Sequence, residues 1–486
     1  MKPALTDAQW QRGVLALVVF CLCAMVMALT TAEADPAQQD LDWEKVMKLL
    51  VLPLVFAALS FVLTGCTTNA AKPGQATEVK LKQEGPFRAQ VVGVQWLNPL
   101  IRRDYPTEWQ LLWTLGLATP NKNDDMVRTE PASFSSVQPV ASIVSNIGQR
   151  KSFSSVFWQY MEDVLRPIGR RYVGNLNYFY TVQPDSPKHW RELAGIHVEF
   201  AIPARPELNP DDAAQIVRDA IIKEFEIGGR PTLSSRNTPP DVRMTAGGAN
   251  AGFTSLAAAL DYLEAHPQET AWVMTWDAPE HPLDERMTEN CVILVLAGPD
   301  YDTRREALAW IARPVVRQVR DFDVQPGEPR AVQAWRAAME AAAAGAGRSV
   351  TDIGYLIHDA GKGRDVSGRR LATLGQVLNE PLPEFNILTQ GFNTTALLGD
   401  TGAGTALTNV ALAIAYAHHR GVPVLVAGTT DAEAAHAVLI SPPARPRVFD
   451  PARTWFRARG EGNAYLPWWG LRKDVDWGRY MQGFSE

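Results

Sequence analysis

Cysteine and histidine are scarce in this chain. Its 486 residues include four cysteines and eight histidines, and Cys21, Cys23 and Cys66 lie in or beside an apolar N-terminus. The remaining cysteine, Cys291, therefore has no partner for an intrachain disulfide in the rest of the chain. The sequence contains neither an HExxH motif nor a CxxC pair. We therefore expect no zinc site and no other metal centre.

An excess of positive charge is also absent. Lys and Arg total 47 against 53 Asp and Glu, which gives a net charge of -6 and an isoelectric point near 5.8. Binding to a phosphate backbone requires clustered basic residues, so we expect no nucleic-acid partner. The sequence also lacks a GxSxG elbow, a P-loop and a GxGxxG fingerprint. These absences remove the familiar hydrolase and nucleotide-binding motifs, and we expect no cofactor.

Long apolar runs are confined to the N-terminus. Residues 13–31 carry no charge over nineteen positions, and residues 49–65 form a second run nearly as long. Acidic residues predominate between the two runs, whereas basic residues flank them on the outside. The positive-inside rule then predicts a pair of apolar membrane helices in residues 1–66, with the body on the cytoplasmic side. A polar linker over residues 67–85 would tether this body to the inner membrane.

A second interpretation of the N-terminus stays open. The segment that begins at Met47 reads as a bacterial lipoprotein signal and ends in the lipobox Leu63-Thr64-Gly65-Cys66. Such a signal would lipidate Cys66 and place the body in the periplasm as an envelope lipoprotein. This interpretation requires initiation at Met47 or cleavage after the first apolar run.

The body from Phe87 onward alternates between strand and helix patterns, which predicts an α/β fold. A boundary rich in Pro and Gly over residues 325–331 divides the body into residues 86–325 and 326–486. Each half carries a Gly-rich turn, a helix of small residues and two segments with a clear strand pattern. Residues 119–152 are expected to be irregular, and residues 234–241 to be a loop. The expected strands are 87–96, 196–202, 271–276, 290–297, 352–358, 422–428 and 435–441. The expected helices are 106–117, 156–165 (halted before Pro167), 212–226, 253–265, 331–344 and 405–418.

Four segments of the body resemble thiolase-like proteins of the β-ketoacyl synthase type. They are AGFTSLAAALDYL at 251–263, IHDAGKG at 357–363, GDTGAGTALTNVALAIA at 399–415 and GTTDAEAAHAVLISPP at 428–443. The resemblance implies a thiolase-like fold of two similar halves. A homodimer stays an open alternative to a monomer, because thiolase-like folds commonly associate through a sheet edge and helices.

The resemblance also assigns three site positions. In such enzymes a Cys thiolate at a helix N-terminus and two His residues carry out decarboxylative condensation. The matching positions here hold Gly252, His358 and Asp400. Glycine supplies no nucleophile, and an aspartate would repel a developing oxyanion. Cys291 cannot replace the nucleophile because it lies in an apolar strand, so we expect a degenerate site without catalytic residues.

The whole chain also resembles the type VI lipase adapter family. The features are the apolar hairpin, the opening GPFRAQVVGVQWLNPL from Gly85, and the ending AAHAVLISPPARPRVFDPARTW at 434–455. The resemblance implies a non-catalytic adapter that binds a phospholipase effector in the cytoplasm and loads it onto the spike protein of the type VI secretion system. Two alternatives remain. One is an envelope lipoprotein that neutralises a lipase, and the other is an acyl-thioester-binding enzyme in the thiolase-like cleft that depends on His358.

Overall fold

The computed structural model describes the body of the chain. It covers residues 85–97, 100, 105–139, 152–174, 193–229, 236–279, 287–303, 306–363, 365–450, 455 and 469. The expected apolar helices of residues 1–66, the lipobox cysteine Cys66 and the linker lie outside these residues. Within the described part of the chain, no helix has the length and apolar character needed to cross a membrane.

The first half of the chain contributes five strands to one mixed sheet. They are β1 (Arg88–Leu97), β2 (His197–Pro203), β3 (Asp241–Gly247), β4 (Thr270–Asp277) and β5 (Asn290–Ala297). Their order in the sheet is β3-β2-β4-β5-β1. β2 is parallel to both β3 and β4, whereas β5 is antiparallel to β4 and β1. β5 is buried along its whole length, as its uninterrupted apolar sequence predicts.

The second half repeats this arrangement. Its strands are β6 (Ala309–Ala312), β7 (Val315–Gln318), β8 (Tyr355–His358), β9 (Gly391–Asn393), β10 (Val424–Gly428) and β11 (Ala434–Ser441). The order β9-β8-β10-β11-β6 has the same sequence of parallel and antiparallel pairs as the first half, and β7 adds to β11. β1 pairs with β6 and joins the halves into one sheet. The expected α/β class with two similar halves is confirmed.

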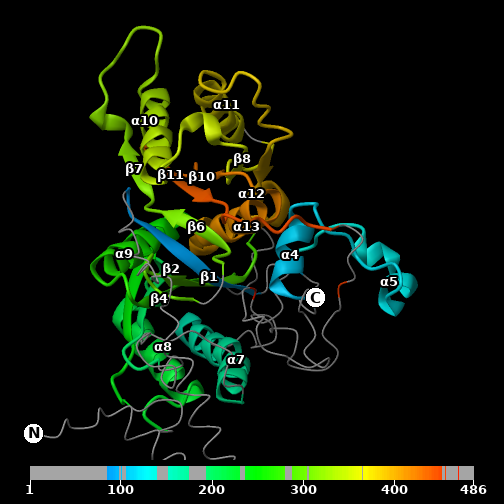
Figure 1. The fold of residues 1–486 in the computed structure, drawn as a ribbon, viewed down its shortest axis with the longest axis vertical. Coiled ribbons are helices and arrows are strands. Elements are labelled where there is room, and N and C mark those ends of the chain that lie inside the picture. The colour runs from blue at the N-terminus through cyan, green and yellow to red at the C-terminus, as the bar shows by residue number, and fades with distance from the viewer. Residues whose placement is uncertain are drawn as a thin grey trace, which may run out of the picture. The chain divides into compact units, whose positions relative to one another are not determined.

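Helices form three layers around the two halves of the sheet. α9 (Ala251–Ala265) and α13 (Thr405–Arg420) share one core with strands from both halves, so they form a middle layer. α7 (Phe153–Gly174) and α8 (Pro210–Glu224) cover the opposite face of the first half. α10 (Arg330–Gly345) and α11 (Asp365–Asn379) cover the opposite face of the second half (Figure 1). The remaining helices are α4 (Thr107–Thr114), α5 (Asp125–Thr129), α12 (Thr394–Leu398) and the short turns η2 (Pro131–Phe134), η3 (Val319–Asp321), η4 (Val350–Asp352) and η5 (Gly402–Gly404).

α13 is the most enclosed helix of the middle layer. All of its residues except Tyr416 and Arg420 are buried. It is rich in alanine and other small side chains, which allow close approach of the sheet halves and of α9. The helix ends at Gly421, whose φ of 70° is the left-handed conformation that glycine adopts at helix ends.

Two expectations about single elements are wrong, namely the end of one helix and the irregular region. The helix expected to stop before Pro167 continues to Gly174, because Val164, Leu165 and Ile168 are buried in a core whose packing outweighs the cost of an internal proline. The described part of the expected loop, residues 236–240, has no regular structure, and the edge strand β3, which the sequence did not predict, begins at Asp241. Within the region expected to be irregular, residues 125–134 form α5 and η2.

Candidate functional site

Gly252, in the position matched to the nucleophile, is the second residue of α9. It is buried against the start of α13. A Cβ atom built on Gly252 would lie 2.9 Å from Leu407 Cγ and 3.1 Å from Ala406 Cβ. Contacts this short are rarely tolerated by real side chains, so the middle layer has closed the position against any nucleophile.

His358, in the first histidine position, is the last residue of β8 and is 2% exposed. Strand alternation places it on the same face as Leu356, which packs with α10 and α11. α9 lies on the other face of this half, with Ile357. The His358 Nδ1 accepts a 3.3 Å hydrogen bond from the Ala360 N–H, and burial lowers the pKa of His358 to about 4. The ring is therefore a neutral core residue at physiological pH.

Asp400, in the second histidine position, lies in the turn before α13 and is exposed. Its carboxylate accepts a hydrogen bond of 2.8 Å from the Gly402 N–H. Its carbonyl accepts a hydrogen bond of 2.7 Å from the Thr288 N–H, so the turn is bound to the first half of the chain. Asp400 thus holds its own turn, because its carboxylate accepts a hydrogen bond from the Gly402 N–H.

A buried carboxylate of the first half fixes the same turn. Asp277, at the end of β4, accepts hydrogen bonds of 2.8 Å from the N–H groups of Ala403 and Ala278. Arg205 Nη2 lies 3.1 Å from Asp277 Oδ1, and its guanidinium stands 4.2 Å above the ring of Phe153. Burial raises the pKa of Asp277 to about 6, although these hydrogen bonds and Arg205 act to lower it.

The turn requires glycine at two positions, because side chains of the first half lie where a Cβ atom would stand. A Cβ on Gly402 would lie 2.0 Å from Asp277 Oδ2, and a Cβ on Gly404 would lie 1.6 Å from Asn290 Oδ1. Asn290 also donates a 2.9 Å hydrogen bond to the Thr401 carbonyl. The motif that resembles a histidine loop is therefore a joint between the two halves of the chain.

Sequence reasoning missed a second polar cluster, at the ends of β8 and β10. Asp359 is 1% exposed, and its Oδ1 accepts hydrogen bonds of 2.6 Å from both the N–H and the hydroxyl of Thr429. Among the described residues, Asp359 Oδ2, Asn250 Oδ1 and His436 Nδ1 are buried without a hydrogen-bond partner. Burial raises the pKa of Asp359 and lowers that of His436. The signal available in the sequence was the polar residue that directly follows each strand, Asp359 after β8 and Thr429 after β10.

The remaining cysteine of the body behaves as the sequence predicts. Cys291 is fully buried in β5, and burial raises the pKa of its thiol far above the ordinary range. A thiol in this state is not a nucleophile. Across the part of the chain that the structure describes, no group of three or more His, Cys, Asp or Glu side chains is arranged to hold a metal ion.

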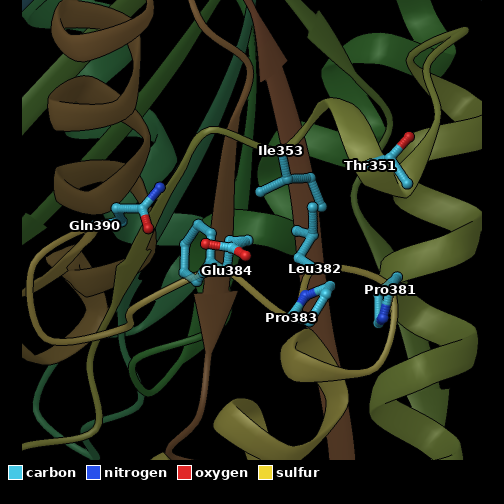
Figure 2. Close-up of a pocket in the computed structure, with 8 residues that line it drawn as sticks. Thr351, Ile353, Pro381, Leu382, Pro383, Glu384 and Gln390 are labelled. Carbon is cyan, nitrogen blue, oxygen red and sulfur yellow. The ribbon is translucent and has the colours of Figure 1, made fainter.

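An open groove lies elsewhere, in the second half. Its volume is about 220 Å³, and it is formed between η4 and the loop that joins α11 to β9. Figure 2 shows Ile353 and Leu382 close together, with Glu384 beside them. The lining residues are Thr351, Ile353, Pro381, Leu382, Pro383, Glu384, Phe385 and Gln390.

The groove and the cluster residues Asp359, Thr429 and His436 lie in one segment that matches a known family. Residues 308–442 match the family described as "Type VI lipase adapter protein Tla3, C-terminal". This segment is similar to the type VI lipase adapter family. The adapter segment contains every residue from β6 to β11, and thus the second half of the sheet.

Several solved structures are similar to the chain. A Streptomyces albus oxazolomycin ketosynthase domain is 13% identical with a TM-score of 0.45, over 76% of this chain and 99% of that chain. The 3-oxoacyl-(acyl carrier protein) synthase III of Pseudomonas aeruginosa is 14% identical with a TM-score of 0.41, over 75% of this chain and 100% of that chain. No curated protein matches. These likenesses concern the fold alone and bring no activity or substrate to this chain.

Proposed function

We propose that the chain is a non-catalytic adapter that binds a type VI lipase effector. The observation that carries this proposal is the match of residues 308–442 to the type VI lipase adapter family. The wider function follows from the same family resemblance. The adapter binds its phospholipase in the cytoplasm of the producing cell and delivers it to the spike protein of the secretion system.

The geometry of the degenerate site supports the non-catalytic part of the proposal. Gly252 has no space for a nucleophilic side chain, and His358 faces the outer helices instead of α9. Asp400 binds its own turn. We expect the chain to leave acyl-thioesters intact. Turnover that disappears in His358→Ala would instead support the alternative of an acyl-thioester enzyme.

The decisive experiment is affinity capture of the tagged full chain from its own host, with bound proteins identified by mass spectrometry. Protease access in intact and lysed spheroplasts then reports the side of the membrane on which the body lies. We expect recovery of a lipase and a spike protein, with a body protected inside the cell. Absence of any lipase under conditions that recover the chain would remove the adapter proposal.

The lipobox at Leu63–Cys66 keeps one alternative in view, namely a periplasmic lipoprotein that neutralises a lipase. Its chemical signature is a lipid on Cys66. Metabolic labelling with a palmitate analogue should leave the wild type unlabelled if the body is cytoplasmic. Labelling that is lost in Cys66→Ser would favour the lipoprotein.

We also propose that the adapter forms a homodimer through the edge of its sheet. The outer edge of β3 pairs with no other strand among the described residues. An open strand edge is a template for pairing with another chain. Light scattering on the purified full chain should give twice the monomer mass, and a monomer mass across a wide concentration range would disprove the dimer.

A further inference from the structure

The loop beside the groove is held in a fixed shape. Most of the hydrogen bonds within the loop involve Asn386. The Asn386 Oδ1 accepts a 2.9 Å hydrogen bond from the Leu388 N–H. The Asn386 carbonyl accepts from the N–H groups of Thr389 and Gln390, at 3.1 and 2.7 Å. The Gln390 Oε1 in turn accepts a 2.9 Å hydrogen bond from the Asn386 N–H. A loop with this bonding keeps its conformation before any partner arrives.

This fixed loop exposes a large apolar side chain. Leu388 is 77% exposed, and it projects from the same loop that lines the groove with Leu382 and Phe385. Phe385 itself is buried, and its N–H donates a 2.9 Å hydrogen bond to the Leu382 carbonyl. An apolar groove in the same loop as an exposed leucine has the apolar character of the central part of a protein interface.

The groove carries a negative charge and no positive one. Glu384 is the one ionisable residue of the lining, and it is exposed. Among the described residues Glu384 takes part in no ion pair, whereas the neighbouring Glu380 is paired with Arg336. A partner with a basic side chain at this point would gain an ion pair without displacing an existing one.

The size of the groove also limits its occupant. Its volume of about 220 Å³ is below the roughly 300–1,000 Å³ typical of small-molecule pockets. It is suited to one large apolar side chain. Trp455 and Trp469, the described residues after Asp450, are buried in the core around α13 and do not line the groove.

We propose that the groove and Leu388 form the docking site for the lipase. The occupant is a segment of the lipase that places one apolar side chain in the groove and a Lys or Arg beside Glu384. This inference rests on the proposed adapter function. It goes further by assigning the contact to one surface of the adapter segment and by stating the chemistry of the lipase segment.

Binding of the purified lipase to the full chain tests the docking site. We expect Leu388→Asp and Glu384→Lys each to raise the dissociation constant at least tenfold. Val324→Asp is the matched control, because Val324 is 75% exposed in the same family segment but outside the groove. Its dissociation constant should stay within twofold of the wild type. Circular dichroism of each variant would identify any that is misfolded.

The outcomes separate the inference from the function on which it rests. If the wild type binds the lipase and the two groove variants bind equally well, the docking site is wrong and the adapter function stands. If the wild type binds no lipase, both are wrong. A photocrosslinking residue at position 388 should capture a lipase peptide that contains an apolar residue next to Lys or Arg, whereas the same residue at 324 should not. Capture of a second copy of the chain at 388 would assign the groove to self-association and overturn the inference.

Discussion

Adding a single methyl group at Gly252 tests whether this position is closed to side chains. We expect Gly252→Ala to lower the free energy of unfolding by about 1–3 kcal/mol, the usual cost of overpacking, although alanine favours helix more than glycine does. Gly252→Cys should lose more and gain no condensing activity. Urea denaturation measures both variants.

Gly248→Ala is the control for these variants. It lies just before the same helix, and its added Cβ would have no atom within 4 Å. Its unfolding midpoint should stay close to that of the wild type. A Gly252→Ala midpoint equal to that of the wild type would show that the position is open.

Two buried groups should give opposite pH dependences of stability. The pKa of Asp277 is raised to about 6 from 3.8, so the folded state binds its proton more tightly than the unfolded state. Its contribution is present below about pH 4 and is lost as the pH rises to about 6. The pKa of His358 is lowered to about 4 from 6.5. Its contribution is present above about pH 6.5 and is lost as the pH falls toward 4.

These contributions, each about 3 kcal/mol at most, should largely cancel in the wild type between pH 4 and 6.5. Asp277→Asn should then show stability that rises with pH, and His358→Gln should show stability that falls with pH. Urea denaturation at pH 4.5, 5.5 and 6.5 measures the slopes. Parallel slopes in the two variants would contradict the assignment.

Sequence comparison located the site positions but not their orientations. The motif around His358 was visible, yet the face of the sheet on which its side chain lies depends on which helices pack against β8, and the sequence does not show this packing. The expected strand started at 352, whereas β8 starts at Tyr355 after a turn of η4. The closure of Gly252 also depends on contacts with α13, about 150 residues away in the chain, and local pattern carries no information on such contacts.

At the scale of elements, the N-terminal cap of α8 should have a measurable share in stability. Asn209 accepts hydrogen bonds from the N–H groups of Asp211 and Asp212, at 2.8 and 3.4 Å. We expect Asn209→Ala to lower the free energy of unfolding by about 1 kcal/mol, because these N–H groups lose their partner. Asn209→Asp keeps an acceptor at the same place and should stay near the wild type. Thermal or urea unfolding checks the difference, and equal losses for both variants would rule out the cap.

The elements that the sequence predicts well are those with a strong pattern of their own. β5 has the expected limits, and β4, α9 and α10 differ from expectation by at most two residues at either end. Among the strands and the longer helices, the sequence did not predict β3, β6, β7, β9 or α11. β3 and β9 are short or half-exposed edge strands, and α11 contains two glycines that weaken its helical pattern. Their structure depends on neighbours that are distant in the sequence.

At the scale of the molecule, the middle layer should be the most protected part of the fold. α13 is enclosed by α9 and by strands of both halves. We expect its backbone amides to exchange with deuterium only through global unfolding, whereas amides of α5 should exchange through local opening. Hydrogen exchange followed by mass spectrometry measures both. Rapid exchange of α13 in native buffer would contradict the layered packing.

β6 and β7 have a consequence for how the chain could be divided. Both strands precede the exposed turn at Gly327, yet both pair with β11, which follows it. A chain cleaved at Gly327 would therefore remain one particle, because β6 and β7 of the first fragment pair with β11 of the second. The two fragments would act as the parts of a split protein. The pairing of β6 and β7 with β11 would hold them together in place of the peptide bond.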